Sequence, residues 1–328
     1  MRADEPVTIL TVAREAGVSK TTASDALRGS GRVSERTRET VAKVAERLGY
    51  VPNGSARHLR KASTGTIGLH VPEVLTRSAY YMSFVFGVVE QAARHDYDVT
   101  LITSGQRRSR PPRVDGLVLG DPLGGDPVVA GLMATGLPTV SCERFPGSRQ
   151  ADGVVWSEHA QMLARLLGHL RSAGSARPGL IVAGDESDWA GSVHRGYLDW
   201  CAAQGVEPLV RRVSFDATGD EIRAAARALL STPMDALVCA PAGAATEVAP
   251  LLRESGAGVL LASCVDSAAT RLADPPITAI DLRPREAGAS CAELLFELLS
   301  GAAPAGTERV HPIELEVRAS TSSVGIRR

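Results

Sequence analysis

The stretch GVSKTTASDAL, residues 17–27, groups short hydroxyl side chains with one lysine and one aspartate. Helical spacing would turn Ala23, Ala26 and Leu27 inward and leave a polar face opposite them. That face consists of Lys20, Thr21, Ser24, Asp25 and Arg28. Short hydroxyl and basic side chains suit contact with phosphates and with the edges of bases, which makes this helix a candidate for binding DNA. Asp25 is the exception, because a carboxylate repels a polyanion.

Three short helices are needed to hold that polar face in place. The apolar spacing of residues 9–16 predicts a helix that stops at Gly17, and Ser19 is a suitable N-cap for the helix that follows. Only three residues separate these two helices, so they must cross steeply, as in a helix-turn-helix. A third helix is predicted after Ser34, its cap. The first part of the chain is therefore expected to be an all-α, three-helix domain.

Charge is unevenly distributed, although the net charge is only −1. Residues 1–61 contain twelve Lys and Arg against seven Asp and Glu, and they include all three lysines of the chain. The remainder contains 24 basic residues against 30 acidic ones. A basic head on an acidic body indicates that the head binds a polyanion and that the body repels it.

From residue 66 onward, nearly continuous apolar strands alternate with amphipathic helices. The segments TIGLHV, LIVAGDE and DALVCAP, for example, each precede a stretch with helical spacing. This alternation predicts parallel sheets that helices cover on both faces, an α/β body. At 328 residues, 44% of them hydrophobic, the chain is long enough for two or three domains.

Several classes of protein are disfavoured by what the sequence lacks. No segment approaches the ~18–20 apolar residues that a membrane span requires, and the start MRADEPVTIL does not resemble a secretory signal, so we expect a cytoplasmic protein without a membrane partner. The five cysteines are widely spaced, which favours buried reduced thiols and no metal site. We find no motif for a nucleophile, a zinc protease, a phosphate loop or a dinucleotide, so no catalytic residue, enzyme activity or cofactor is expected.

Residues 8–72 resemble the DNA-binding headpiece and hinge of the LacI/GalR (lactose-repressor) family. The segments that carry this resemblance are TVAREAGVSKTTAS, VSERTRETV, RLGYVPN, ARHL and TGTIGL, in matching order and spacing. The family fold implies a helix-turn-helix headpiece over residues 1–52, a hinge helix and linker over 53–64, and a two-lobe, periplasmic-binding-protein-like body over 65–328. The N-lobe would comprise about 66–153 and 285–308, and the C-lobe about 154–282 and 309–320.

The resemblance also implies roles in DNA binding. Ser19, Thr22 and Ser24 would hold phosphates, while Lys20, Thr21 and Asp25 would face bases in the major groove. In the hinge, Leu59 would insert between base steps of the minor groove, with Ala56 packing the hinge against its dimer mate. The full set expected to contact DNA is Ser19, Lys20, Thr21, Thr22, Ser24, Asp25, Arg28, Asn53, Ala56 and Leu59.

Two interpretations of Asp25 remain open at this point. As a base-reading residue, its carboxylate would accept a hydrogen bond from cytosine N4. Alternatively, it would form an i,i+3 pair with Arg28 and brace the arginine against the DNA.

The body departs from the family in two places. After DVTLITSGQ the family has a further helix, whereas here only RRSRPPR precedes the next strand. In the cleft, the polar groups by which sugar-binding members hold hydroxyls are replaced by Val193, Pro241, Ala242 and Val265. Asp266 alone remains of the acidic turn. The expected effector is therefore a small molecule other than a simple sugar, held by stacking on aromatic rings.

The residues expected to bind this effector are Tyr80, Tyr81, Glu143, Arg144, Trp156, Trp189, Val193 and Asp266. A cleft without any effector and a sugar bound by other means are the alternatives. As a whole, the resemblance implies a transcriptional regulator, a repressor more readily than an activator. It would bind a pseudo-palindromic operator as a homodimer, under allosteric control by the effector. A transport-associated solute-binding protein of the same body fold is disfavoured by the headpiece.

Overall fold

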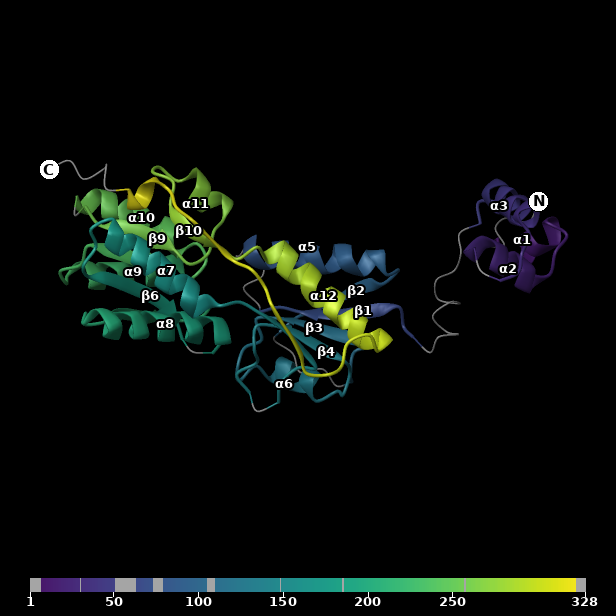
Figure 1. Cartoon of the computed structure of the whole chain (residues 1–328), viewed down its shortest axis with the longest axis horizontal. Helices are drawn as coiled ribbons and strands as arrows, with labels where there is room; N and C mark the ends of the chain where they lie inside the picture. The colour runs from purple at the N-terminus through teal and green to yellow at the C-terminus, as the bar shows by residue number, and fades with distance from the viewer. Residues whose placement is uncertain are drawn as a thin grey trace. The chain divides into compact units, whose positions relative to one another are not determined.

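The computed structural model describes residues 7–29, 31–50, 63–72, 79–104, 110–147, 149–184, 186–256 and 258–322. The chain forms two compact units, Met1–Ser63 and Thr64–Arg328 (Figure 1). The predicted hinge residues Asn53, Ala56 and Leu59 lie outside the described residues.

The first unit contains the three predicted helices, α1 (Ile9–Glu15), α2 (Lys20–Arg28) and α3 (Glu35–Arg47). Each begins after a hydroxyl N-cap whose side chain accepts a hydrogen bond from a backbone N–H of the first turn. Those caps are Thr8, Ser19 and Ser34. The helices share one small core, made of Val12, Ala13, Ala23, Ala26, Val41 and Ala45.

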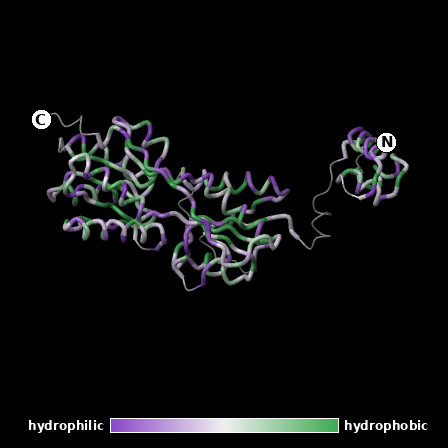
Figure 2. The backbone as a smooth tube through the Cα atoms, viewed as in Figure 1, coloured by the Kyte–Doolittle hydropathy of each residue, from purple (hydrophilic) through white to green (hydrophobic). Residues whose placement is uncertain are grey.

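The second unit is built on two six-stranded sheets, whose strands carry the most hydrophobic stretches of the chain (Figure 2). The first sheet has the order β11-β5-β4-β3-β1-β2, with all neighbours parallel. Its strands are β1 (Thr66–His70), β2 (Asp98–Ile102), β3 (Gly116–Gly120), β4 (Thr139–Cys142), β5 (Gly153–Trp156) and β11 (Thr307–Val310). Helices α5 (Ala79–Arg94) and α12 (Pro284–Ser300) cover one face of this sheet, and α6 (Pro127–Met133) packs on the other.

The second sheet has the order β12-β10-β9-β8-β6-β7, in which only the β10–β12 pair is antiparallel. Its strands are β6 (Pro178–Ala183), β7 (Leu209–Val213), β8 (Ala236–Cys239), β9 (Leu260–Ser263), β10 (Thr278–Asp281) and β12 (Glu314–Glu316). Helices α7 (His159–Ser172) and α8 (Asp188–Gln204) pack on one face, and α9 (Gly219–Leu230) and α10 (Ala244–Ser255) on the other. The short helix α11 (Ala268–Leu272) and a 3₁₀ turn, η2 (Ala319–Thr321), complete this lobe. The α/β body of two lobes is therefore confirmed.

Two details of the lobes bear on the predictions. The first sheet extends through β5 to Trp156, three residues past the expected boundary at 153, because β5 pairs with both β4 and β11. Between β2 and β3, the described residues 103–104 and 110–115 contain no helix. A connection of only thirteen residues therefore crosses from one side of β1 to the other.

The described helices include none that is both long and apolar enough to span a bilayer. All five cysteines are buried, and none is joined to another by a disulfide. Their burial agrees with the buried reduced thiols that their wide spacing predicts.

Helices α5 and α12 cross in direct backbone contact through glycines. A Cβ atom at Gly87 would overlap the carbonyl of Arg285, and one at Gly288 would overlap the carbonyl of Phe84. Because these partners are backbone atoms, they cannot move aside without shifting a whole helix. The crossing ties the last helix of the body to the first.

We predict that Gly288→Ala destabilises the body by about 1–3 kcal/mol or more, because the added methyl group overpacks this crossing. Gly168→Ala is the matched control. Gly168 lies inside α7 with open space around it, so alanine should stabilise by about 0.5–1 kcal/mol through its helix propensity. Thermal unfolding of the two variants measures the difference, and a Gly288→Ala variant as stable as the parent would contradict the close crossing.

Candidate functional site

The polar face of α2 is arranged for contact with a polyanion. Ser19 is the N-cap of the helix and Lys20 is its first residue. The side chains of Ser19, Lys20 and Thr21 are exposed. The Ser19 hydroxyl accepts from the backbone N of Thr22 at 3.1 Å and lies 2.8 Å from its hydroxyl. The N-terminus of α2 therefore carries exposed hydroxyl and ammonium groups beside the positive end of the helix dipole.

Asp25 and Ser24 are half-buried on the same helix. The Asp25 carboxylate lies against the turn that follows α2, since a Cβ atom on Gly31 would be 3.0 Å from its Oδ2. Gly31 has a φ of 76°, which a side chain would oppose. Asp25 therefore packs on the turn between α2 and α3; the side chain of Arg28 lies outside what the structure describes.

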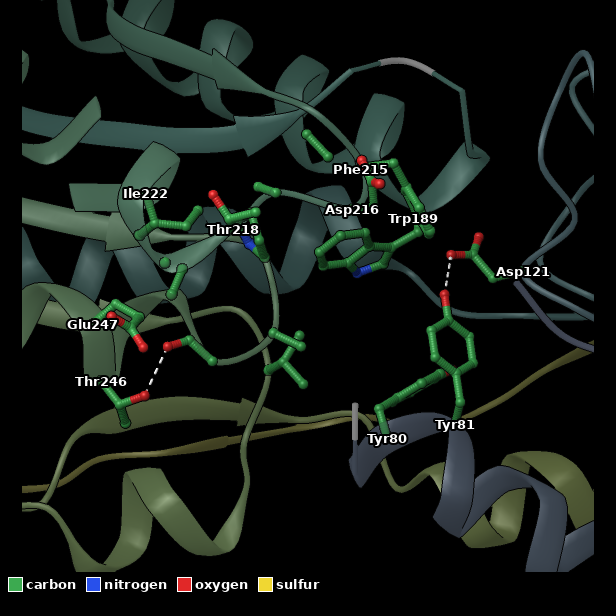
Figure 3. Close-up of a pocket in the computed structure, with 18 of the residues that line it drawn as sticks. Tyr80, Tyr81, Asp121, Trp189, Phe215, Asp216, Thr218, Ile222, Thr246 and Glu247 are labelled. Carbon is green, nitrogen blue, oxygen red and sulfur yellow. Dashed lines mark hydrogen bonds between the residues drawn. The ribbon is translucent and has the colours of Figure 1, made fainter. Parts of the chain in front are cut away.

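A second candidate site is a cavity of about 390 Å³ in the body, a size suited to a small molecule. It opens where the carboxyl ends of both sheets meet (Figure 3). It is lined by residues in the loops that follow β3, β4, β7, β8, β9 and β10, together with the start of α5 and the N-termini of α9 and α10. The lining is Tyr80, Tyr81, Asp121, Glu143, Ala183, Trp189, Phe215, Asp216, Ala217, Thr218, Gly219, Ile222, Pro241, Ala242, Gly243, Ala244, Thr246, Glu247, Val265 and Leu282. Parallel α/β sheets place ligands at this edge.

Asp121 is the most perturbed acid of the cavity. Its side chain is buried, its Oδ2 accepts from the Tyr81 hydroxyl at 3.1 Å, and its Oδ1 has no hydrogen-bond partner among the described residues. Burial, and next the charge of Glu143, raise the pKa of Asp121 to about 7. Tyr81, His159 and the Ser187 hydroxyl lower this pKa, but by less than burial and Glu143 raise it. The Ser187 hydroxyl does not form a hydrogen bond with Oδ1.

Glu143 connects the two lobes at the cavity wall. It follows β4 in the first lobe, and its Oε1 lies 2.9 Å from Nε2 of His159, the first residue of α7 in the second lobe. Burial lowers the pKa of His159, but the carboxylates of Glu143, Asp121 and Asp188 together raise it by more, so the net shift is upward. A second contact between lobes is the hydrogen bond from the Gly124 N–H to the Glu186 carbonyl, at 2.6 Å.

Aromatic rings and apolar side chains form the rest of the wall. Tyr80 and Tyr81 meet edge to face with centroids 5.1 Å apart, and Trp189 and Phe215 lie on the opposite lobe (Figure 3). The indole Nε1 of Trp189 is buried without a hydrogen-bond partner among the described residues. Burial raises the pKa of both tyrosines well above the ordinary value, which keeps them neutral.

Of the residues expected to bind an effector, Tyr80, Tyr81, Glu143 and Trp189 lie on the cavity wall and the other four do not. Arg144 stacks on Trp156, 4.0 Å from its ring centroid, and pairs with Glu308 at 2.7 Å. Val193 is buried in the core of the second lobe.

Asp266, the remaining acid of the turn, is fixed by two arginines. Its oxygens accept hydrogen bonds from Arg271 and Arg318 at 2.7–2.9 Å, and these bonds, outweighing burial, lower its pKa to about 2. Its neighbour Val265 lines the cavity in its place. Pro241 and Ala242, where polar groups were expected in a sugar site, also line the cavity.

Asp121 and part of the second-lobe wall, Phe215, Asp216, Thr218 and Glu247, were not predicted from the sequence. Asp121 directly follows a fully buried strand, GLVLG, so its place at the carboxyl end of that strand was a usable signal. Phe215, Asp216 and Thr218 lie in the loop between β7 and α9, and Glu247 lies in the first turn of α10, and no motif sets any of them apart. Among the described residues, no group of three or more His, Cys, Asp or Glu side chains is arranged to hold a metal ion.

Comparison with known proteins finds similarity along nearly the whole chain. Residues 8–53 match the family described as bacterial regulatory proteins, lacI family, and residues 167–321 match a periplasmic binding protein-like domain. The HTH-type transcriptional regulator CelR of Thermobifida fusca is 31% identical over 95% of this chain and 98% of its own length.

Two solved structures are similar in fold. A complex of the transcriptional regulator CelR with cellobiose matches with a TM-score of 0.70 and 27% identity, over 96% of this chain and 99% of that one. A Lac repressor dimer bound to operator and the anti-inducer ONPF matches with a TM-score of 0.80 and 22% identity, over 97% of this chain and 100% of that one. At that identity, the second comparison supports the fold alone.

The buried acids predict how stability depends on pH. The folded-state pKa of Asp121, about 7, exceeds its unfolded value near 3.9, so the folded state holds a proton that the unfolded state has released. Stability should therefore fall as pH rises from about 4 to 7, by up to about 1.4 kcal/mol per unit for this group. The raised pKa of His159 acts in the same direction.

We expect Asp121→Asn to flatten this dependence, as measured by thermal unfolding of the full chain between about pH 5 and pH 8. Asp199→Asn is the control, because Asp199 is exposed on α8 away from the cavity. Equal slopes for the Asp121 variant and the parent would show that Asp121 is ionised throughout.

Proposed function

The chain belongs to the LacI family of bacterial regulatory proteins, and from that premise we propose that it is a repressor under the control of a small-molecule effector. It binds a pseudo-palindromic operator as a homodimer, in the cytoplasm. The observation that carries this proposal is the joint presence of a capped, hydroxyl-rich α2 in one unit and a polar cavity between the lobes of the other.

DNA binding is the established part of this function, since the relatives are DNA-binding transcriptional regulators. We assign the contacts with DNA to the exposed N-terminal part of α2, Ser19 to Ser24. In the hinge, the proposed wedge Leu59 and its neighbours Asn53 and Ala56 complete the contact set. Repression rather than activation is proposed because a regulator that kinks promoter DNA most simply blocks polymerase.

Homodimer formation is supported by an unpartnered apolar stripe on α5. Met82, Phe86 and Val89 recur at helical spacing and are exposed, Phe86 by 54%. A stripe of this kind on a surface helix favours burial against a second copy, which two-fold symmetry would place on the same face. The Lac repressor structure of similar fold is a dimer on its operator.

Effector control is supported by the cavity. Its wall contains two buried polar atoms, Asp121 Oδ1 and Trp189 Nε1, that have no hydrogen-bond partner in the described part of the chain, and such atoms favour a ligand that satisfies them. A vestigial cleft would be expected to fill with apolar side chains instead. Because both lobes contribute to the wall, occupancy changes their relative position, and we propose that this change orders or melts the hinge helices.

The direct test is selection of bound sequences from a random pool of duplex DNA by the full-length protein. We expect a pseudo-palindromic site, and affinity for it that falls at least 100-fold between about 50 and 200 mM salt as phosphate contacts are lost. Binding that is independent of salt would contradict the role of the basic head.

The same selection with Asp25→Asn distinguishes its two interpretations. Because the carboxylate lies against the turn at Gly31, we expect a uniform change of affinity and an unchanged consensus. A preference altered tenfold or more at one operator position, about 1.4 kcal/mol, would mean that Asp25 contacts a base.

For the dimer, we expect Phe86→Glu to shift the protein to monomers in sedimentation velocity and to weaken operator binding, because it places a charge in the proposed apolar interface. Leu272→Glu is the matched control, since Leu272 is 84% exposed on α11 and outside the stripe. A Phe86→Glu variant that remains dimeric would exclude α5 as the interface.

A further inference from the structure

The described part of the cavity wall carries charge of one sign. Four carboxylates line it, from Asp121, Glu143, Asp216 and Glu247, whereas none of the described lining residues is Lys, Arg or His. Glu247 is partnered by Arg223 and Glu143 by His159, both from outside the lining. Asp121 has no cationic partner within 4 Å among the described residues, so its end of the cavity combines negative charge with burial.

The environment of Asp121 favours a ligand that carries a hydrogen-bond donor. One oxygen already accepts from the Tyr81 hydroxyl at 3.1 Å, and the other has no partner among the residues that the structure describes, although Asp121 is only 6% exposed. A buried carboxylate oxygen without a donor costs free energy, which a donor on the ligand would recover. A charged N–H donor recovers more than a neutral hydroxyl, because a charge-assisted hydrogen bond is roughly twice as strong.

Aromatic rings surround the same end of the cavity. Tyr80 and Tyr81 stand edge to face on α5, and Trp189 lies across from them (Figure 3). Aromatic faces attract cations, most strongly where water is excluded. Trp189 also contributes a buried indole N–H that no described residue accepts from, which favours a ligand with a hydrogen-bond acceptor.

From this combination we propose that the effector is an organic amine that carries its positive charge on a protonated nitrogen and also bears a hydroxyl or carbonyl oxygen. The nitrogen donates to Asp121 Oδ1 between the rings of Tyr80, Tyr81 and Trp189, and the oxygen accepts from Trp189 Nε1. This inference rests on the proposed effector function of the cavity and specifies its ligand.

A neutral polyol fits the same wall less well. On the opposite lobe, Pro241, Ala242 and Val265 offer no side-chain donor or acceptor to a ring of hydroxyls. The polar side chains of that lobe's wall include those of Asp216, Thr218, Thr246 and Glu247, and Glu247 is already paired with Arg223. A polyol would also leave the negative charge of Asp121 without a cationic partner, whereas Glu143 is already paired with His159. The distinction between amine and polyol is therefore one of charge, and matched pairs of ligands test it.

The experiment is isothermal titration of the full-length protein with two pairs that differ only by an amine in place of a hydroxyl. The probes are tyramine against tyrosol and glucosamine against glucose, so that an aromatic and a saccharide source of the amine are tested separately. Above neutral pH, we expect the amine of at least one pair to bind at least tenfold more tightly than its alcohol.

Asp121→Asn should abolish this preference, because it keeps the shape of the side chain and removes its charge. Asp199→Asn, which removes the same charge from an exposed position on α8, should retain the preference. Operator binding by both variants confirms that they fold.

Three outcomes would overturn the proposal. They are equal or tighter binding of the alcohols, binding of none of the four probes, and a preference for amines that survives in Asp121→Asn. Tight binding of glucose with release of operator would leave the regulator function intact and make the ligand a neutral saccharide. Failure to bind any operator would instead contradict the proposed function, whatever the titrations show.

Discussion

The ligand cavity depends on two buried carboxylates that lie at the ends of neighbouring parallel strands. Asp121 and Glu143 directly follow β3 and β4, and both have a left-handed backbone, with φ of 47° and 66°. Such a backbone costs of order 1 kcal/mol for a non-glycine residue, and two acids in a buried site repel each other. The surrounding groups offset these costs: Tyr81 donates to Asp121, and His159 compensates the charge of Glu143.

These compensating groups come from elements that the fold must hold in place from a distance. Tyr81 lies in the first turn of α5, whose position is set by the glycine crossing with α12, nearly two hundred residues later in the chain. His159 begins α7 in the other lobe. A carboxylate in one lobe therefore holds a histidine in the other, and a change of charge in the cavity acts on the contact between lobes. This is a physical route by which a ligand changes the arrangement of the body.

Local signals were sufficient to predict the headpiece and the class of the body. The caps Ser19 and Ser34 and the short spacing between helices determine the three helices, because each signal acts within a few residues. Alternating apolar strands and helices likewise predicted both sheets. The boundary at 153 was misplaced because β5 is completed by pairing with β11, which lies some 150 residues away and leaves no local trace.

The cavity was predicted only in part, and for a related reason. Tyr80, Tyr81, Glu143 and Trp189 line it as their types suggested, but Arg144 stacks on Trp156 and Asp266 is held by Arg271 and Arg318. Whether a polar side chain faces a ligand or an internal partner depends on which distant residues reach it. Asp121 shows the converse: its place after the buried strand GLVLG marks the carboxyl end of that strand, but its burial depends on Tyr81 and Glu143, which are distant in sequence.

The central claim is that occupancy of the cavity alters operator binding. Fluorescence anisotropy of selected operator DNA, at fixed protein and increasing concentration of a cavity-binding amine, tests it most directly. In the parent, we expect the apparent operator affinity to change at least tenfold at saturation, a coupling free energy of about 1.4 kcal/mol, and we expect no such change in Asp121→Asn. An operator affinity that stays constant while the amine saturates the cavity would contradict it.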